Sequence, residues 1–238
     1  MSKHFSSIII PYFGNWELTH QRLGELYRFA PADRIEVILV NDASPELDCK
    51  SGAGWWTNSF TGFKVRYVEN KTNLGFGGSN NKGAKVASGD ILIFLSNDVV
   101  ISGGFVEQIE SIIDNYNGDV MIGNQVLYYD TGWNTIEIKG KPSIVCYPVG
   151  YLLACTKVLW NTIGGFDPIY GVYDYEDVDL GAWCIYNDIQ MVALNSPSLK
   201  HLGEQTVRKV NPNREEHTRK NQILFKEKWT DLLTEKYK

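Results

Sequence analysis

Four carboxylates lie within six residues in the C-terminal half of the chain. The segment Tyr173–Leu180 contains Asp174, Glu176, Asp177 and Asp179, and it follows the glycine-rich turn Gly164–Asp167. An apolar helical pattern comes next, so we expect these acids in the first helical turn, where the helix dipole favours negative charge and keeps a carboxylate ionised. An ionised carboxylate can take a proton from a hydroxyl group. An acidic helix cap on a solvated surface explains the cluster equally well.

Polar residues also follow three short runs that are typical of buried strands. The runs Ser6–Pro11, Ile35–Val40 and Ile91–Leu95 are apolar and rich in β-branched residues. Their ends carry Pro11 and Tyr12, then Asn41 and Asp42, then Ser96, Asn97 and Asp98. Ligands of open α/β sheets bind beyond the carboxyl ends of the strands, so we expect the three polar ends along one crevice.

Both carboxylates at these strand ends are suited to bind a ligand, and Asp42 has a structural role as an alternative. Asp42 can accept hydrogen bonds from a ribose hydroxyl or a base N–H, but it can equally cap a turn. Asp98, with diphosphate oxygens and water, is sufficient to hold Mg²⁺ or Mn²⁺, which need few protein ligands.

The elements that must position these residues alternate between strand and helix. A helix is predicted over residues 16–29, a third strand over Lys64–Val68, and further helices near residues 80–87 and 105–115. This order predicts an α/β fold with a mostly parallel sheet. The aromatic residues 128–151 have no regular pattern and are predicted to form a substrate-specific lobe of the same domain.

The segment Asn73–Gly83 is unusually rich in glycine and asparagine. Such a turn can expose backbone N–H groups to phosphate oxygens near a helix start, or it can allow close packing of the helix on the sheet. It matches neither a P-loop nor G-x-G-x-x-G, which weighs against a dinucleotide-dependent oxidoreductase.

Composition favours a globular, soluble and intracellular protein over a membrane or nucleic-acid-binding protein. The chain has 238 residues with 43% hydrophobic content, no apolar run of about 18 residues and no signal-peptide pattern. Its four cysteines are widely spaced, so we expect reduced thiols. The net charge of −5 and the lack of a recognisable nucleic-acid-binding motif disfavour nucleic acid as a partner.

The tail differs from the body. Residues 200–238 carry 10 basic and 6 acidic side chains, with Ile223, Leu224, Phe225, Trp229, Leu232 and Leu233 at helical spacing. The apolar stripe of this basic amphipathic helix packs back on the domain or contacts a membrane surface or another protein.

Six segments in this order resemble the family-2 inverting nucleotide-sugar glycosyltransferases of the GT-A fold. They cover residues 5–206 and are Ser7–Tyr12, Val40–Ser44, Asn73–Gly83, Phe94–Asp98, Gly164–Asp167 and Glu176–Leu180. The resemblance implies a single Rossmann-like domain over residues 1–238, with helices on both faces of the sheet. Its parts would be a nucleotide-binding half (1–100), an acceptor-binding half (101–200) and the basic tail (201–238).

The resemblance also implies roles for individual residues. Donor binding falls on Pro11, Tyr12, Asp42, Gly75, Asn81, Ser96 and Asn97. Asp98 matches the metal-binding carboxylate of the Asp-x-Asp segment, whose first acid is replaced here by Ser96, and His201 stands where some members place a further metal ligand. Asp177 matches the general base, and Glu176 would bind acceptor hydroxyls. Trp133, Tyr147, Tyr151, Tyr170 and Tyr173 are candidates for stacking on sugar rings, with core packing as the alternative for each.

The predicted function is therefore transfer of a sugar, with inversion and with Mg²⁺ or Mn²⁺, from a UDP- or dTDP-sugar to a hydroxyl of a glycan or lipid-linked saccharide. The Asn73–Gly83 segment is similar to the rhamnosyltransferase-type branch. We expect the protein in the cytoplasm. Peripheral contact of the tail with the inner face of a membrane is compatible with this location. The alternatives are a catalytically inactive nucleotide-sugar-binding protein and, less favoured, a sugar nucleotidyltransferase.

Overall fold

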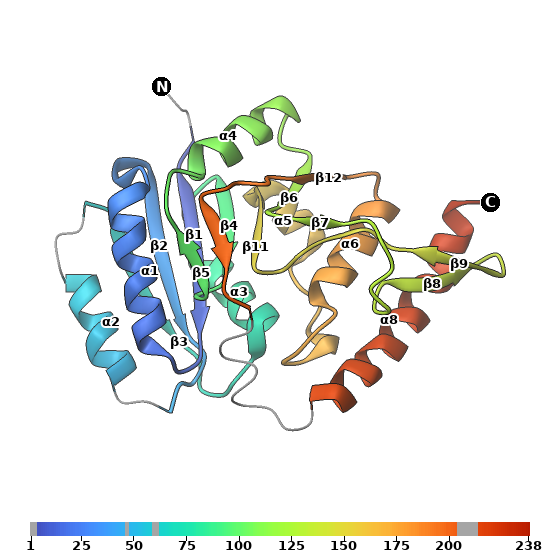
Figure 1. Cartoon of the computed structure of the whole chain (residues 1–238), viewed down its shortest axis with the longest axis horizontal. Helices are drawn as coiled ribbons and strands as arrows, with labels where there is room; N and C mark the ends of the chain where they lie inside the picture. Colours follow the sequence, from blue (N-terminus) through green and yellow to red (C-terminus); the bar gives the residue numbers. More distant parts are fainter. Residues whose placement is uncertain (1–3, 46–47, 59–61, 204–213) are drawn as a thin grey trace.

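A seven-stranded sheet runs through the molecule (Figure 1). Its strand order is β12 (Gln190–Ala193), β6 (Val120–Gly123), β11 (Leu152–Thr156), β4 (Ile91–Leu95), β1 (Ser6–Tyr12), β2 (Ile35–Asn41) and β3 (Lys64–Glu69). The computed structural model describes residues 4–45, 48–58, 62–203 and 214–238.

The sheet is mostly parallel, as the sequence predicted. Strands β4, β1, β2 and β3 pair in parallel, as do β6 and β12. Strand β11 is the exception, because it pairs antiparallel with both β4 and β6. It thereby joins strands from the two halves of the chain into one sheet.

Helices cover both faces of the sheet because alternate strand residues point to opposite sides. Ile8 and Ile10 pack on the side of α1 (Trp16–Phe29), α2 (Asp48–Asn58) and α4 (Val106–Asn115). Ile9 packs on the other side, against α3 (Gly75–Val86), α5 (Lys157–Ile163) and α6 (Glu176–Tyr186). The α/β class with helices on both faces is confirmed.

Short strands and turns complete the fold. Strand β5 (Val99–Ile101) pairs with β13 (Leu199–His201), β7 (Val126–Leu127) with β10 (Tyr147–Pro148), and β8 (Thr135–Ile138) with β9 (Lys141–Ile144). Two 3₁₀ turns are η1 (Ala32–Arg34) and η2 (Pro168–Tyr170). The aromatic segment that the sequence predicted to be irregular therefore forms small antiparallel ladders, which are too short to produce a clear alternating pattern.

The last described helix, α8 (Arg214–Lys236), packs along α6 and the β8–β9 hairpin (Figure 1). Its buried side chains are Asn221, Phe225, Trp229 and Leu233, so its own domain covers the apolar stripe. Ile223 and Leu232, which the sequence assigned to the stripe, are exposed. Residues 204–213 of the predicted tail lie outside the described residues. Within the described ranges, no helix combines the length and apolar character needed to cross a bilayer.

Candidate active site

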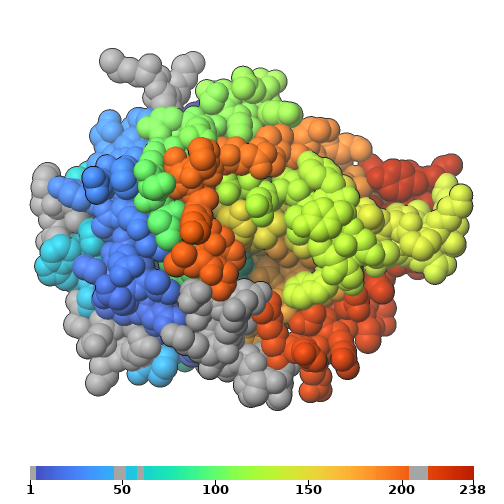
Figure 2. Space-filling view, viewed as in Figure 1, coloured from blue at the N-terminus to red at the C-terminus, as the bar shows by residue number. Residues whose placement is uncertain are grey.

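A cavity of about 340 Å³ lies beyond the carboxyl ends of β1, β2 and β4. The space-filling view shows the molecule hollowed between the β13 segment, drawn in orange, and the β7–β10 segment, drawn in yellow-green (Figure 2). The predicted site residues that line the cavity are Pro11, Tyr12, Asp42, Gly75, Ser96, Asn97, Asp98, Glu176, Asp177 and His201. The structure thus brings together residues from both halves of the chain and from the tail.

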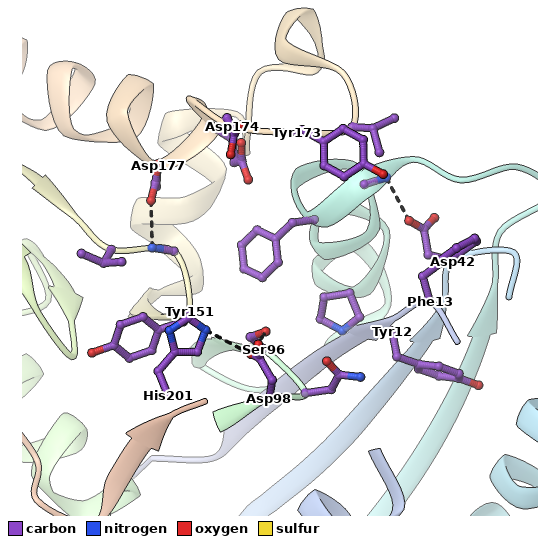
Figure 3. A pocket seen from close by; sticks show the side chains of 18 of the residues that line it. Tyr12, Phe13, Asp42, Ser96, Asp98, Tyr151, Tyr173, Asp174, Asp177 and His201 are labelled. Carbon is purple, nitrogen blue, oxygen red and sulfur yellow. Dashed lines mark hydrogen bonds and ion pairs between the residues drawn. The ribbon is translucent and has the colours of Figure 1, made fainter. Parts of the chain in front are cut away.

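Asp42 holds the start of α3 at the edge of this cavity. Its Oδ1 accepts hydrogen bonds from the Leu74 N–H at 2.8 Å and from the Asn70 side chain at 2.7 Å, and its Oδ2 accepts one from the Gly75 N–H at 2.9 Å (Figure 3). The helix therefore begins at Gly75, five residues earlier than the sequence predicted, because a distant carboxylate satisfies its first N–H groups. Asp42 is a helix cap, and its Oδ2 still has a lone pair for a ligand.

The glycines of α3 serve close packing. A side chain at Gly83 would collide with Ile9 of β1, and one at Gly77 would lie 3.1 Å from the Cβ of Phe166. At these two positions, glycine therefore allows close packing of the helix, which was one of the two interpretations of the glycine-rich segment.

Asn81 does not line the cavity. Its Nδ2 donates to the carbonyl of Phe166 at 2.8 Å, and its Oδ1 accepts from the Phe166 N–H at 2.9 Å. Both ends of the amide fix the Gly165–Phe166 turn, which precedes the acidic segment. This geometry assigns Asn81 to support of the turn, whereas the resemblance implied donor contact.

Asp98 and His201 meet on the floor of the cavity (Figure 3). The Nε2 of His201 lies 3.2 Å from Oδ1 of Asp98, and the ring of Tyr151 stacks on the imidazole with 4.5 Å between centroids. Ser96 donates to the same Asp98 oxygen at 2.6 Å. Antiparallel pairing of β13 with β5 places His201 opposite Val99, next to Asp98, and so explains how residues 103 positions apart come together.

The Asp98–His201 pair suits a divalent cation. One carboxylate and one imidazole are competent ligands, and Mg²⁺ or Mn²⁺ takes its remaining ligands from phosphates and water. Within the described ranges, no group of three or more His, Cys, Asp or Glu residues is placed to hold a metal on its own. A metal here would therefore depend on the bound donor to complete its coordination.

Asp177 faces the cavity in a fixed orientation. Its Oδ2 accepts a hydrogen bond from the Gly150 N–H at 2.9 Å, and its Oδ1 accepts one from the Val178 N–H at 2.9 Å (Figure 3). Burial raises the pKa of Asp177 above its ordinary value, while these two hydrogen bonds oppose the rise. Asp177 lies in the first helical turn, as predicted, but burial rather than the helix dipole is the main influence on its pKa.

Glu176 has a pKa raised further from its ordinary value. Burial is the main cause, and the neighbouring charge of Asp177 adds to it. The two adjacent acids therefore have different environments, since Asp177 accepts two backbone hydrogen bonds that lower its pKa. Different pKa values at adjacent carboxyls are typical of a pair with separate acid–base roles.

The remaining acids of the segment lie in other environments. Asp179 is covered by α8 and accepts hydrogen bonds from Tyr170 at 2.8 Å and from the Trp229 indole at 2.6 Å. Lys228 pairs with Asp179 at 2.8 Å. Asp179 is thus a structural anchor for α8.

The aromatic candidates for sugar stacking divide into two groups. Tyr170 does not line the cavity. Trp133 does line it, stacks on Tyr175 with 6.1 Å between centroids, and lies 6.0 Å from the Arg214 guanidinium. Tyr151 stacks on His201. Tyr147 is buried, so Trp133 and Tyr173 are the two candidates that line the cavity with an incompletely buried ring.

Two cavity residues could not be identified from the sequence. Gly150 contributes only its backbone N–H, which carries no sequence signal. Arg214 begins α8 and forms a bidentate ion pair with Asp174 through Nε at 3.1 Å and Nη2 at 2.8 Å. The spacing of Arg214, Thr218 and Asn221 on one helix face is the only signal that could have indicated it.

The backbone just before α6 is strained. Asp174 and Tyr175 have φ values of 60° and 83°, and residues other than glycine rarely adopt this left-handed region of backbone conformation. Each such residue costs about 1–3 kcal/mol unless its surroundings hold it. Strain of this kind is common next to functional groups, and here Glu176 follows directly.

Solved structures of glycosyltransferases share this architecture. The mannosyltransferase PcManGT from Pyrobaculum calidifontis, in complex with GDP-Man and Mn²⁺, aligns with a TM-score of 0.61 and 16% identity over 79% of this chain and 54% of that one. GalNAc-T7 with UDP, GalNAc and Mn²⁺ aligns with a TM-score of 0.63 and 14% identity over 80% and 42%. S. aureus TarS 1–349 in complex with UDP-GlcNAc aligns with a TM-score of 0.62 and 16% identity over 92% and 66%.

These likenesses show the GT-A fold. The chain spans about half the length of PcManGT and less of GalNAc-T7. Among curated proteins, none matches the chain by sequence. The model of Glycosyl transferase family 2 matches residues 7–174, which include the donor-side strand ends, Asp98 and the turn before the acidic segment. The chain belongs to glycosyl transferase family 2.

Proposed function

We propose that this protein is an inverting glycosyltransferase that moves a sugar from a nucleoside diphosphate donor to a hydroxyl group. The observation that carries the proposal is one cavity lined by Asp42, Asp98 and the Glu176–Asp177 pair (Figure 3). Family membership supports glycosyl transfer, and the structural relatives are named with GDP-Man, UDP or UDP-GlcNAc.

The donor nucleotide occupies the side of the cavity formed by α3 and the ends of β1, β2 and β4. Pro11, Tyr12, Asp42, Gly75, Ser96 and Asn97 line this side. Asp42 accepts a base N–H or a ribose hydroxyl through the free lone pair on Oδ2. We propose a UDP- or dTDP-sugar, because the 3-position N–H of uracil and thymine can donate to such a carboxylate.

Asp98 and His201 would hold Mg²⁺ or Mn²⁺ against the diphosphate. When bound, the cation neutralises the charge that grows on the leaving group. The carboxylate of Asp98 is only 4% exposed and lies beside the half-buried imidazole, so both ligands are placed before the donor arrives. Two structural relatives, PcManGT and GalNAc-T7, are complexes with Mn²⁺, which supports this assignment.

Asp177 acts as the general base. The acceptor hydroxyl gives its proton to the carboxylate as its oxygen attacks the anomeric carbon, and the bond from that carbon to the diphosphate oxygen breaks on the opposite side. Attack from the face opposite the leaving group inverts the anomeric configuration. The hydrogen bonds from Gly150 and Val178 fix the base, and Glu176 binds acceptor hydroxyls.

We propose a glycan or a lipid-linked saccharide as acceptor, with Tyr173 facing its sugar or the donor base. Cys146, Cys155 and Cys184 are free thiols, which supports a reducing, cytoplasmic setting; the side chain of Cys49 lies outside the described ones. The exposed Ile223 and Leu232 on α8, together with the basic excess of the tail sequence 200–238, support peripheral contact with an anionic membrane face.

We also propose one domain over residues 1–238. The donor half (1–100), the acceptor half (101–200) and the tail (201–238) all contribute to the cavity, and β11 joins the two halves within one sheet. None of the three parts contains the whole set of site residues.

A thermal-shift panel tests the donor site. UDP, dTDP, GDP and CDP are each added with and without Mn²⁺, since selective binding stabilises the folded state by mass action. We expect Mn²⁺-dependent stabilisation by UDP or dTDP that is lost in Asp98→Ala. No shift with any nucleotide would contradict the donor site.

A turnover assay tests the two alternative functions. Release of the diphosphate from the matching nucleotide sugar by wild type but not by Asp177→Asn would exclude an inactive binding protein. Release of pyrophosphate from a nucleoside triphosphate would indicate a nucleotidyltransferase instead.

A further inference from the structure

The segment that leads into the Glu176–Asp177 pair adopts backbone angles that it would not keep on its own. Gly171 has φ 70° and ψ −130°, a region open essentially to glycine, and Asp174 and Tyr175 are both left-handed. A segment with such angles needs contacts from outside itself to hold one conformation. The question is which part of the molecule supplies them.

Asn221 of α8 supplies the backbone contacts. Its Nδ2 lies 2.8 Å from the carbonyl oxygen of Tyr170, 2.5 Å from that of Tyr173 and 3.0 Å from that of Asp174. Asn221 is 2% exposed, so no water replaces these bonds if the amide is removed. One amide group thus ties down three carbonyls of the segment 170–174.

The same helix face holds the side chain of Asp174. Arg214 binds it with two hydrogen bonds, and the Thr218 hydroxyl donates to its Oδ2 at 2.6 Å. Residues 214, 218 and 221 follow the spacing of one helix face. The first half of α8 therefore grips this segment through both backbone and side chain.

The segment itself connects the two sides of the cavity. Val172 lies so close to Gly75 that a side chain at Gly75 would collide with the Val172 backbone. The carbonyl of Tyr175 accepts the Asp179 N–H at 2.8 Å, so Tyr175 begins the hydrogen-bonding of α6. A change of backbone angle at residues 174 and 175 would reorient Glu176 and Asp177 relative to Gly150 and to the donor side.

We propose that the first half of α8 is part of the active site, and that Asn221 is a positioning residue that fixes the Glu176–Asp177 pair through residues 170–175. This inference rests on the proposed function for its catalytic consequence. It assigns α8 a role that differs from a membrane tail and from a simple cover over the core.

Two variants and a matched control test the inference in the full chain. Asn221→Leu removes the donors at similar size, and Asn221→Asp replaces the amide by an acceptor. Leu233→Ala is the control, because Leu233 is 1% exposed on the same helix but lies three turns away from the segment. All three are expected to lower the melting temperature, so stability alone does not decide.

The decisive readouts are local exchange and the split between binding and turnover. UDP-GlcNAc, GDP-mannose and dTDP-rhamnose with Mn²⁺ serve as probes, and release of the nucleoside diphosphate is measured at a temperature where every variant is folded. We expect the Asn221 variants to release it on the order of 10²-fold more slowly, the loss typical of a misplaced catalytic group, with the Kd of the free diphosphate nearly unchanged. Amide hydrogen exchange in residues 172–178 is expected to be faster only in these variants.

The outcomes separate this inference from the proposed function. If wild type releases no nucleoside diphosphate from any probe, the transferase proposal fails, and the exchange measurement still decides whether Asn221 fixes the segment. If Leu233→Ala slows release or speeds exchange at residues 172–178 as much as the Asn221 variants do, the positioning role is overturned. An Asn221→Leu protein with wild-type release would overturn it as well.

Discussion

The backbone N–H of Gly150 lies 2.9 Å from Oδ2 of Asp177, and this hydrogen bond ties the carboxylate to the chain that enters β11. The position of Asp177, the proposed base, is therefore fixed by the central sheet as well as by its own helix. A carboxylate oxygen has a second lone pair, so Oδ2 can accept an acceptor hydroxyl while it keeps the Gly150 contact.

Asp177→Asn should abolish proton transfer and leave donor binding in place. General base catalysis contributes about 10²–10⁴-fold to rate, and we expect a loss of kcat of that order. Turnover of the donor and calorimetric binding of its nucleoside diphosphate measure the two effects. The exposed Asp119→Asn is the control and should behave as wild type. An Asp177→Asn enzyme with normal kcat would exclude Asp177 as the base.

Glu176→Gln should stabilise the protein at alkaline pH. The folded-state pKa of Glu176 is raised by burial and by Asp177, so the protein loses stability as pH rises from the unfolded pKa to the folded pKa, where only the unfolded chain is ionised at this residue. A neutral Gln has no such loss. Below the unfolded pKa of about 4.3 both forms are neutral, so the difference should vanish. Melting temperatures of the two proteins from pH 4 to pH 9 provide the measurement. A gap that widens toward acid pH would have the wrong sign.

Glu36→Leu should destabilise the sheet. Glu36 is fully buried and accepts hydrogen bonds from Ser7 Oγ at 2.7 Å and from the Ser88 N–H at 2.6 Å, and it pairs with Arg66 at 2.8 Å. Breaking a buried pair of this kind costs about 3–5 kcal/mol, and the partial exposure of Arg66 places the expectation at about 3 kcal/mol.

The pH dependence of the Glu36 effect provides its control. Burial opposes ionisation of Glu36, but the hydrogen bonds from Ser88 and Ser7 and the charge of Arg66 outweigh it and lower the pKa. The stabilisation is thus present above the unfolded pKa of about 4.3 and is lost as pH falls through the folded value. Urea unfolding at pH 7 and pH 3 should show the difference shrinking in acid. The exposed Glu137→Gln should show neither effect.

Gly75→Ala should disturb the contact between α3 and the segment before α6. Gly75 has φ 71°, and an added Cβ would collide with the backbone of Val172. Left-handed strain alone costs about 1–3 kcal/mol. We expect a lower urea midpoint and weaker binding of the donor diphosphate. Gly54→Ala, where nothing lies within 4 Å of the new Cβ, is the matched helical control. Equal effects of the two substitutions would contradict the collision.

The sequence predicted the sheet and the donor side well because their signals are local. Short β-branched runs gave β1, β2 and β4, and the rule that ligands bind at the carboxyl ends of such strands brought Tyr12, Asp42 and Asp98 together. Glu176, Asp177 and Asp179 lie in the first turn of α6 as predicted, whereas Asp174 precedes the helix. These features depend on residues near each other in the chain.

The features that the sequence could not give depend on distant partners. Asp42 starts α3 from 33 residues away, so the helix begins at Gly75 rather than near Asn80. Asn81 is turned toward Phe166 by a contact across 85 residues. The pKa of Asp177 depends on how deeply the folded chain buries it, and no spacing rule encodes burial.

The position of β4 at the centre of the sheet affects the order in which the molecule can assemble. Strand β4 pairs with β1 on one side and with β11 on the other. The pairing of β4 with β11 can form only after residue 156 has been synthesised. The Rossmann-like strands β1, β2 and β3 can pair early, but the cavity needs His201 and α8. On the ribosome, β1, β2, β3 and β4 would therefore be available to pair first, whereas the cavity could be completed only after His201 and α8 have been made.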